Sequence, residues 1–182
     1  MTHPARWIAA AVGAVVVVLG VVLALNVGTD PQLESRHNRL LGREAPHLDL
    51  PALGGTRVTE DDVAGKAVIV NFWNTWCIPC QKELPALKAF YAAHANDPDF
   101  AMVGIVRDAQ ETKAGIAQYV KDEGMGWTIA FDPGSQAALD FATRGQPETF
   151  AISPNGRIVG FQLAEVTVPN LEKMLSYARG QT

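Results

Sequence analysis

Hydrophobic and polar residues alternate in a way that divides the chain into short apolar runs and helical patterns. Residues 67–73, 100–106 and 127–131 are short apolar runs, which are typical of buried strands. Between them, apolar residues recur every three or four positions over residues 77–94 and 112–123, as they do on one face of a helix. Strands separated by helices predict an α/β fold with parallel strands at the centre of its sheet.

The flanks of this region predict further elements. Residues 45–58 alternate around a Gly54-Gly55 pair, which predicts an N-terminal β-hairpin. Residues 153–156 form a turn signal between two expected antiparallel strands. These two strands are predicted over residues 146–152 and 157–161. A capped helical turn is predicted over residues 59–63, a brief third helix over residues 132–141 and a final helix over residues 168–178. The pattern therefore predicts a central mixed β-sheet that is flanked by helices.

A long apolar run precedes the α/β region. Residues 7–27 contain no charged residue, and about 20 apolar residues are enough to span a bilayer as a helix. A secretory signal has a shorter apolar core and a small-x-small cleavage site, for which residues 22–24 are a poor candidate. We therefore predict an uncleaved transmembrane helix. Arg6 precedes the run and acidic residues follow it, which favours a cytoplasmic N-terminus.

This anchor predicts a single-pass protein of the cell membrane, with its catalytic domain on the extracytoplasmic side. The predicted parts are a cytoplasmic N-terminus, the anchor, a polar linker and one soluble domain: residues 1–6, 7–27, 28–42 and 43–182. Disulfides persist in such a compartment. The whole chain of 182 residues has a net charge of −4, which argues against nucleic-acid binding.

The only two cysteines, Cys77 and Cys80, form a Cys-x-x-Cys sequence at the junction between the central strand and the first long helix. This position places Cys77 over the first helical turn, where unpaired N–H groups and the helix dipole favour a thiolate. The thiolate is the reactive form of cysteine. Cys80, one turn further along, is close enough to attack a mixed disulfide. The pattern predicts thiol–disulfide exchange.

Three other interpretations of the two cysteines are weaker. Inert buried cysteines are disfavoured by Pro79 between them, which sets the first helical turn, and by Trp76, which flattens the surface beside the sulfur. Zinc would need two further ligands, and the four histidines are scattered. A disulfide that closes a four-residue loop would stabilise the fold only weakly. We expect a redox-active disulfide, with no metal and no cofactor.

The residues around the cysteines resemble the membrane-anchored thioredoxin-like proteins of bacteria, the TlpA/ResA/CcmG (DsbE) group. The pattern that carries the resemblance is Asn71-Phe72-Trp73-x-x-Trp76-Cys77-x-Pro79-Cys80-x-x-Glu83-x-Pro85. Residues 145–150 look like the second signature of this group, and the likeness extends over residues 43–179. The resemblance implies a thioredoxin-like fold and the activity of a thiol–disulfide oxidoreductase.

The resemblance also implies a surface that binds substrate. Pro147 would be the cis-proline that thioredoxin-like folds carry opposite their cysteines, although most prolines are trans. A cis bond there would expose the backbone of Gln146, so that an extended segment of a substrate could pair with it. Trp76 would complete this surface beside Cys77.

The sequence offers two candidates for the proton acceptor of Cys80. Ordinary thioredoxin has a buried aspartate where this chain has Asn71, so the acceptor must come from elsewhere. Glu83 lies one turn beyond Cys80 and is either an exposed carboxylate or, as in ResA-like proteins, an active-site group. Glu148 is either an exposed strand residue or, as in CcmG-like proteins, part of the active-site surface.

The function that we predict is a tethered reductase of protein disulfides. By resemblance, its substrates would be cysteine-containing proteins such as apocytochrome c during cytochrome c maturation, and a membrane thiol–disulfide electron donor would recharge it. The main alternative is a thiol oxidase, because tens of millivolts in reduction potential decide the direction. A copper metallochaperone would need a histidine ligand, and the only histidine after Cys80 is His94. A peroxidase is disfavoured because the threonine that usually precedes the reactive cysteine is not arranged in that way here. Asn74 occupies the third position before Cys77.

Overall fold

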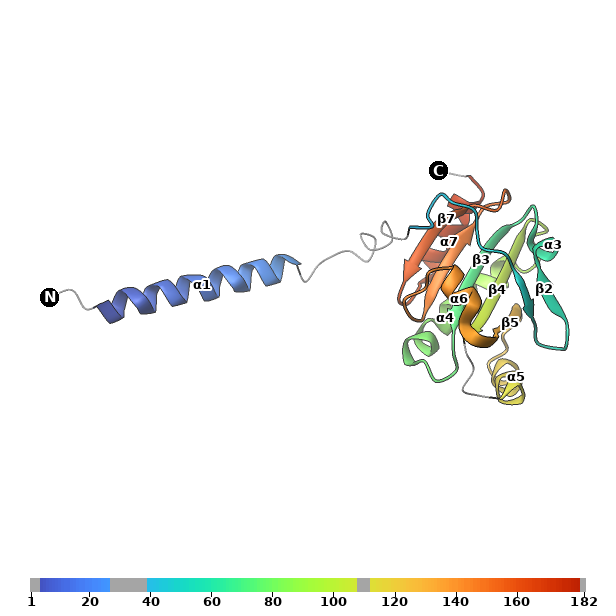
Figure 1. Ribbon diagram of the computed structural model, residues 1–182, viewed down its shortest axis with the longest axis horizontal. Coiled ribbons are helices and arrows are strands. Elements are labelled where there is room, and N and C mark those ends of the chain that lie inside the picture. The colour runs from blue at the N-terminus through green and yellow to red at the C-terminus, as the bar shows by residue number, and fades with distance from the viewer. Residues whose placement is uncertain (1–3, 27–38, 108–111, 181–182) are drawn as a thin grey trace. The chain divides into compact units, whose positions relative to one another are not determined.

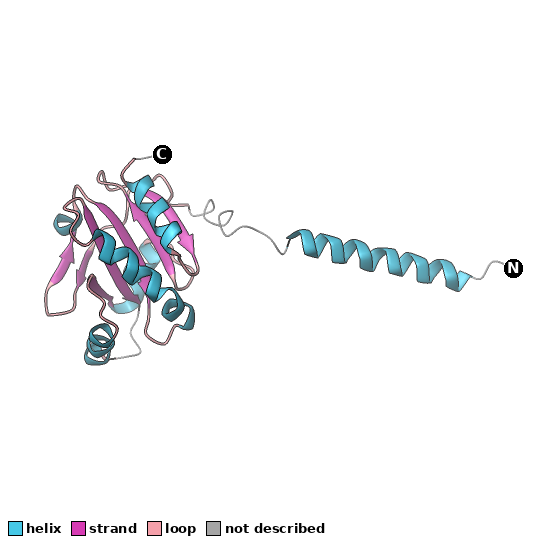
Figure 2. Cartoon of the chain, turned by 180° about the vertical axis from the view of Figure 1, so that it is seen from behind, coloured by secondary structure: helices cyan, strands magenta, loops and turns pink. Residues whose placement is uncertain are grey.

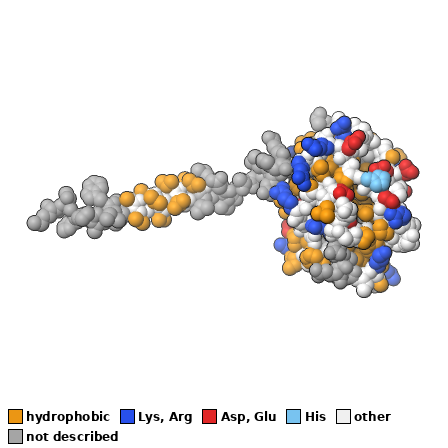
Figure 3. Space-filling view, in the orientation of Figure 1, with side chains coloured by type: hydrophobic (Ala, Val, Ile, Leu, Met, Phe, Trp, Pro, Cys, Tyr) orange, Lys and Arg blue, Asp and Glu red, His pale blue; other side chains and the backbone are white. Residues whose placement is uncertain are grey.

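The structure is a computed structural model that comprises two compact units, Met1–Leu33 and Glu34–Thr182. It describes residues 4–26, 39–107 and 112–180 and, within the first helix, the side chains of residues 11–22 only. This helix is α1 (Pro4–Asn26), and its described side chains are hydrophobic and exposed (Figure 3). Within the described part of the chain, no helix combines the length and the hydrophobicity that crossing a bilayer requires.

The predicted anchor over residues 7–27 is therefore not confirmed and stays a prediction. Most of the predicted linker, residues 28–42, lies outside the described residues.

A five-stranded mixed sheet forms the centre of the second unit, in the order β5-β4-β3-β6-β7 (Figure 1). Its strands are β3 (Ala67–Trp73), β4 (Phe100–Arg107), β5 (Thr128–Asp132), β6 (Glu148–Ile152) and β7 (Ile158–Leu163). β3, β4 and β5 are parallel, whereas β6 and β7 are antiparallel to their neighbours. Every residue of β3 is buried, as expected for a strand that is covered on both faces. The sequence-based prediction of a mixed sheet is confirmed.

Helices cover both faces of this sheet, and each face has its own hydrophobic core. The side chains that β3 directs to one face pack against α4 (Ile78–His94), α5 (Lys113–Asp122) and α7 (Val168–Ala178). Those on the other face pack against α6 (Gln136–Asp140) and against apolar side chains of residues 40–63. Figure 2 shows helices lying across the sheet on one side, and Figure 1 shows α6 on the other.

The predicted N-terminal hairpin is also present. It consists of β1 (Asp49–Pro51) and β2 (Arg57–Thr59), which pair antiparallel and lead into α3 (Glu60–Val63). Most predicted boundaries agree with the structure to within two residues. The expected third helix over residues 132–141 is a 3₁₀ turn (Pro133–Ser135) followed by α6, because the Asp132 carboxylate accepts the Ala137 and Ala138 N–H groups and so begins the α-helix there.

Gly104, in β4, lies between two tryptophan rings. A Cβ atom at this position would lie 2.9 Å from Nε1 of both Trp73 and Trp127. We therefore expect Gly104→Ala to lower the free energy of unfolding by roughly 1–3 kcal/mol, because large buried rings would have to move. Urea unfolding measures the change. Gly115→Ala is the control, since its Cβ would make an ordinary contact on a helix and should be neutral or stabilising. Equal stability of Gly104→Ala and the wild type would contradict this prediction.

Candidate active site

Cys77 and Cys80 form a disulfide at the N-terminus of α4, with an S–S distance of 2.05 Å. Cys77 is the residue that caps the helix, and its Sγ accepts a hydrogen bond of 3.2 Å from the Cys80 N–H. Pro79 lies in the first turn, where its missing N–H costs no hydrogen bond. A sulfur in this position faces the positive end of the helix dipole, which favours the thiolate once the disulfide is reduced. The predicted position of the cysteine pair is confirmed.

The disulfide lies just beneath the surface. Cys77 and Cys80 are 4% and 5% exposed, whereas Trp76 and Ile78 on either side of Cys77 are 52% and 66% exposed. Cys77 is thus more sheltered in the disulfide form than the sequence suggested. Two large apolar side chains at the surface provide a contact area through which a partner protein would approach the sulfurs.

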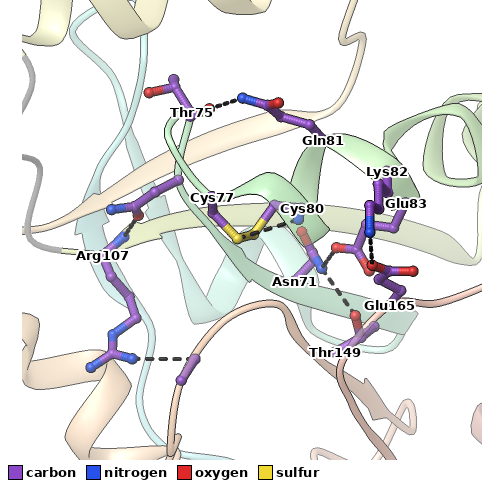
Figure 4. The surroundings of a disulfide bond; sticks show 12 residues. Asn71, Thr75, Cys77, Cys80, Gln81, Lys82, Glu83, Arg107, Thr149 and Glu165 are labelled. Atoms are coloured by element: carbon purple, nitrogen blue, oxygen red, sulfur yellow. Dashed lines mark hydrogen bonds and ion pairs between the residues drawn. A yellow bond between two sulfur atoms is a disulfide. The ribbon is translucent and has the colours of Figure 1, made fainter.

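Glu83 is buried beside the disulfide and is fully hydrogen-bonded (Figure 4). Its Oε1 accepts a hydrogen bond of 2.8 Å from the Asn71 side-chain amide, and its Oε2 accepts one of 2.9 Å from the Val166 backbone N–H. The same Asn71 amide nitrogen donates to Thr149 Oγ1 at 3.0 Å. The interpretation of Glu83 as an exposed carboxylate is wrong, because the start of α7 and the centre of β3 enclose it.

Burial raises the pKa of Glu83 to about 7 from an ordinary value of 4.5. The hydrogen bonds from Val166 and Asn71 favour the ionised form and oppose this shift, while the charge of Glu165 adds slightly to it. A carboxyl group with this pKa exchanges its proton near neutral pH, as a general acid or base does.

Cys80 and Glu83 lie one turn apart on the buried face of α4. Asn71, which binds the Glu83 carboxylate, also lines a small internal cavity together with Cys80. The arrangement therefore places a titratable carboxyl group one helical turn from the second cysteine, and Asn71 connects this carboxyl group with the cavity that Cys80 lines. Position 71 holds an asparagine in this chain, so the aspartate of ordinary thioredoxin is missing there. The Glu83 carboxylate, which is hydrogen-bonded to Asn71, lies close to that position.

The Gln146–Pro147 peptide bond is cis, as the resemblance to the TlpA/ResA/CcmG group implied. Phe72 pairs with Glu148, so Pro147 lies level with the end of β3, from which the chain leads to Cys77. The predicted substrate-binding residues Trp76, Gln146 and Pro147 thus belong to two loops at the same end of the sheet.

Glu148 lies on the opposite face of the sheet from Glu83. It pairs with Phe72, whose ring belongs to the α6 core, whereas Thr149 pairs with Asn71 on the α4 side. Its side chain is fully buried, so the interpretation as an exposed strand residue is wrong. Its Oε1 accepts the backbone N–H groups of Arg144 and Gly145 at 2.6 and 2.9 Å. Glu148 therefore binds the loop before Pro147 from the α6 face of the sheet. Its position on this face does not support proton exchange with Cys80.

His94, the histidine considered for a copper site, lies at the far end of α4. Its ring nitrogens bind Asp97 at 2.8 Å and Glu172 at 3.0 Å. Among the residues that the structure describes, no group of three or more histidine, cysteine, aspartate and glutamate side chains is arranged to hold a metal ion.

Comparison with known proteins identifies the family. The model of the AhpC/TSA family matches residues 41–161, which is more than half of the chain. The chain belongs to the AhpC/TSA family. Among the relatives of this chain, the thiol-disulfide oxidoreductase ResA of Bacillus cereus is 32% identical over 135 residues, which cover 74% of this chain and 76% of ResA. ResA of Bacillus subtilis is 31% identical over 65% of this chain and 64% of its own length.

A solved structure shares the fold of this chain. A protein of Chlorobium tepidum described as a thiol:disulfide interchange protein DsbE superposes with a TM-score of 0.67 at 26% identity, over 76% of this chain and 96% of its own. The thioredoxin-like fold expected from the sequence is confirmed. With the Cys77–Cys80 disulfide at a helix N-terminus, this AhpC/TSA family member is a thiol–disulfide oxidoreductase.

Proposed function

We propose that this oxidoreductase reduces disulfide bonds in other proteins, with Cys77 as the nucleophile and Cys80 as the resolving cysteine. The observation that carries the proposal is the disulfide at the N-terminus of α4 with the buried Glu83 one turn further along. The direction of electron flow is inferred from the resemblance to the ResA and CcmG proteins.

The reaction starts from the dithiol form. The Cys77 thiolate attacks one sulfur of the substrate disulfide, and the other substrate sulfur leaves as a thiolate. Ionised Glu83 then takes the proton of the Cys80 thiol, and the Cys80 thiolate attacks Cys77 Sγ. This step forms the Cys77–Cys80 disulfide and releases the second substrate sulfur. Two electrons pass to the substrate, whose thiolates take up the protons.

We further propose that the domain works outside the cytoplasmic membrane and is tethered by α1. After Arg6, this helix contains no charged residue, and the chain up to residue 27 continues without one. A compartment that favours disulfides requires a dedicated electron source, which we propose to be a membrane thiol–disulfide donor. Apocytochrome c, with its paired haem-binding cysteines, is the proposed substrate.

The reduction potential of the Cys77–Cys80 pair in the purified chain tests the direction. A reductase requires a potential near that of thioredoxin, about −270 mV, whereas a value near that of the oxidant DsbA, about −120 mV, would establish the thiol oxidase alternative. A fusion of alkaline phosphatase to the C-terminus tests the location separately. This reporter is active only outside the cytoplasm, and an inactive fusion would refute the proposed topology.

A further inference from the structure

Arg107, the last residue of β4, contacts two loops that are distant from it in sequence. Its backbone N–H donates to Asn74 Oδ1 at 3.1 Å, and Asn74 lies in the segment that leads from β3 to Cys77. Its guanidinium Nη1 donates to the Gly145 carbonyl at 3.2 Å, two residues before Pro147 (Figure 4). A single residue therefore joins the two segments that carry Cys77 and Pro147.

The strand register explains how one side chain reaches the second segment. Trp73 pairs with Val106, so Arg107 lies just beyond the end of β3, and its side chain is on the α6 face of the sheet together with that of Glu148. Because β3 ends there, the guanidinium passes the end of this strand and reaches the loop that precedes β6.

Arg107 and Glu148 together fix the peptide groups on both sides of Gly145. The Gly145 N–H binds the Glu148 carboxylate, and the Gly145 carbonyl binds the Arg107 guanidinium. The Arg107 guanidinium is charged, and a hydrogen bond from a charged donor is stronger than one between neutral groups. Burial raises the pKa of Glu148, while the N–H groups of Arg144 and Gly145 and, to a smaller extent, the charge of Arg107 oppose this shift.

We infer that Arg107 is a positioning residue, which holds the loop before Pro147 in register with the segment before Cys77. The inference rests on the proposed function, since these two segments form the surface that binds a substrate protein. Arg107 does not touch the reacting sulfurs. It sets the separation between the backbone that pairs with the substrate and the cysteine that attacks it, and a small change in that separation is costly to a positioned reaction.

The test is Arg107→Ala in the full-length chain, which removes the guanidinium and leaves the backbone bond to Asn74. With insulin as the protein disulfide, we expect KM to rise roughly tenfold, the size expected when one charge-assisted hydrogen bond is lost. The rate with cystamine should not change, because this small disulfide has no peptide group to pair with the loop. Arg107→Lys keeps the charge and a donor group and should raise KM less than Arg107→Ala does. Equal loss with both disulfides, or an unchanged KM for insulin, would overturn the inference.

Two further measurements separate this inference from the proposed function. Hydrogen exchange of the amides at residues 144–145 should become faster in Arg107→Ala and should not change in Arg57→Ala, which removes an arginine of the β1–β2 hairpin that is paired with Asp49. Unchanged exchange at residues 144–145 refutes the positioning role whatever the activity is. A wild-type chain that fails to reduce insulin refutes the proposed reductase, while the exchange result still decides the role of Arg107.

Discussion

Cys80→Ser should accumulate as a mixed disulfide with its substrate proteins, and Cys77→Ser should form no such adduct. Removing the Cys80 sulfur leaves the backbone N–H that binds Cys77 Sγ in place, so the nucleophile keeps the contact that favours its thiolate. The first exchange then proceeds, but no second thiol is available to release the partner. Turnover of a protein disulfide should fall to the uncatalysed rate in both variants.

Non-reducing gel electrophoresis, followed by mass spectrometry of the adducts, measures this outcome. The double variant Cys77→Ser/Cys80→Ser is the control for non-specific capture, because these two residues are the only cysteines of the chain. If Cys77→Ser trapped partners and Cys80→Ser did not, the assignment of nucleophile and resolving cysteine would be reversed.

Glu83→Gln should slow the resolution of the mixed disulfide much more than its formation. Glutamine cannot take the proton of Cys80, and general base catalysis of this kind typically contributes about a hundredfold or more. In the wild type, the resolution rate should rise with pH around pH 7, where Glu83 becomes ionised, and this inflection should disappear in Glu83→Gln. Rapid-mixing kinetics over a series of pH values resolves the two steps.

Glu165→Gln is a suitable control, because it removes a nearby carboxylate that is exposed and paired with Lys82. It should retain the inflection near pH 7. Equal slowing of attack and resolution in Glu83→Gln would count against the proposed role of this carboxylate.

Glu83→Gln should also change how the free energy of unfolding depends on pH. The pKa of Glu83 is higher in the folded chain than in the unfolded chain, so the folded state binds more protons between pH 4.5 and pH 7. The contribution of Glu83 to stability is then largest at low pH and falls as pH rises through this window, by about 3 kcal/mol in total. Glu83→Gln should lack this part of the decline, whatever fixed stability it loses through its altered hydrogen bonds. Denaturant unfolding at pH 5 and pH 8 measures the difference, and parallel profiles would contradict it.

Local sequence signals were sufficient to predict most of the fold. The apolar run of β3, the helical spacing after Cys77 and the turn at residues 153–156 each specify their element without help from the rest of the chain. α6 was predicted less well, because its start depends on a contact between Asp132 and two backbone N–H groups further along the chain.

The active site shows a similar division. The cysteine pair and Pro147 could be identified because they lie in short patterns, but the surroundings of Glu83 could not. Its environment depends on Val166, which contributes only a backbone N–H and leaves no trace in the residue types. Asn71, a lone polar residue within a buried apolar strand, was a usable signal that a polar partner lies nearby.

Arg107 and Glu148 were harder to interpret from the sequence. A charged residue at the end of a strand is usually solvated, and nothing near Arg107 in the chain indicates that Gly145 is its partner. Glu148 follows a proline that lies beside the active site, yet the alternation of side chains along β6 turns it to the other face. The family resemblance indicated that Glu148 lies near the active site, and only the strand register shows which face of the sheet its side chain is on.

The surrounding chain covers the two sulfurs, and this burial affects how fast the cysteine pair exchanges electrons with other molecules. Small thiols and oxidants in solution meet little of Cys77 or Cys80, so adventitious electron exchange with them should be slow. A protein that docks on Trp76 and Ile78 gains access that a freely diffusing molecule lacks. Such kinetic insulation would let the pair remain out of equilibrium with its compartment and exchange electrons faster with proteins that dock beside it than with small molecules.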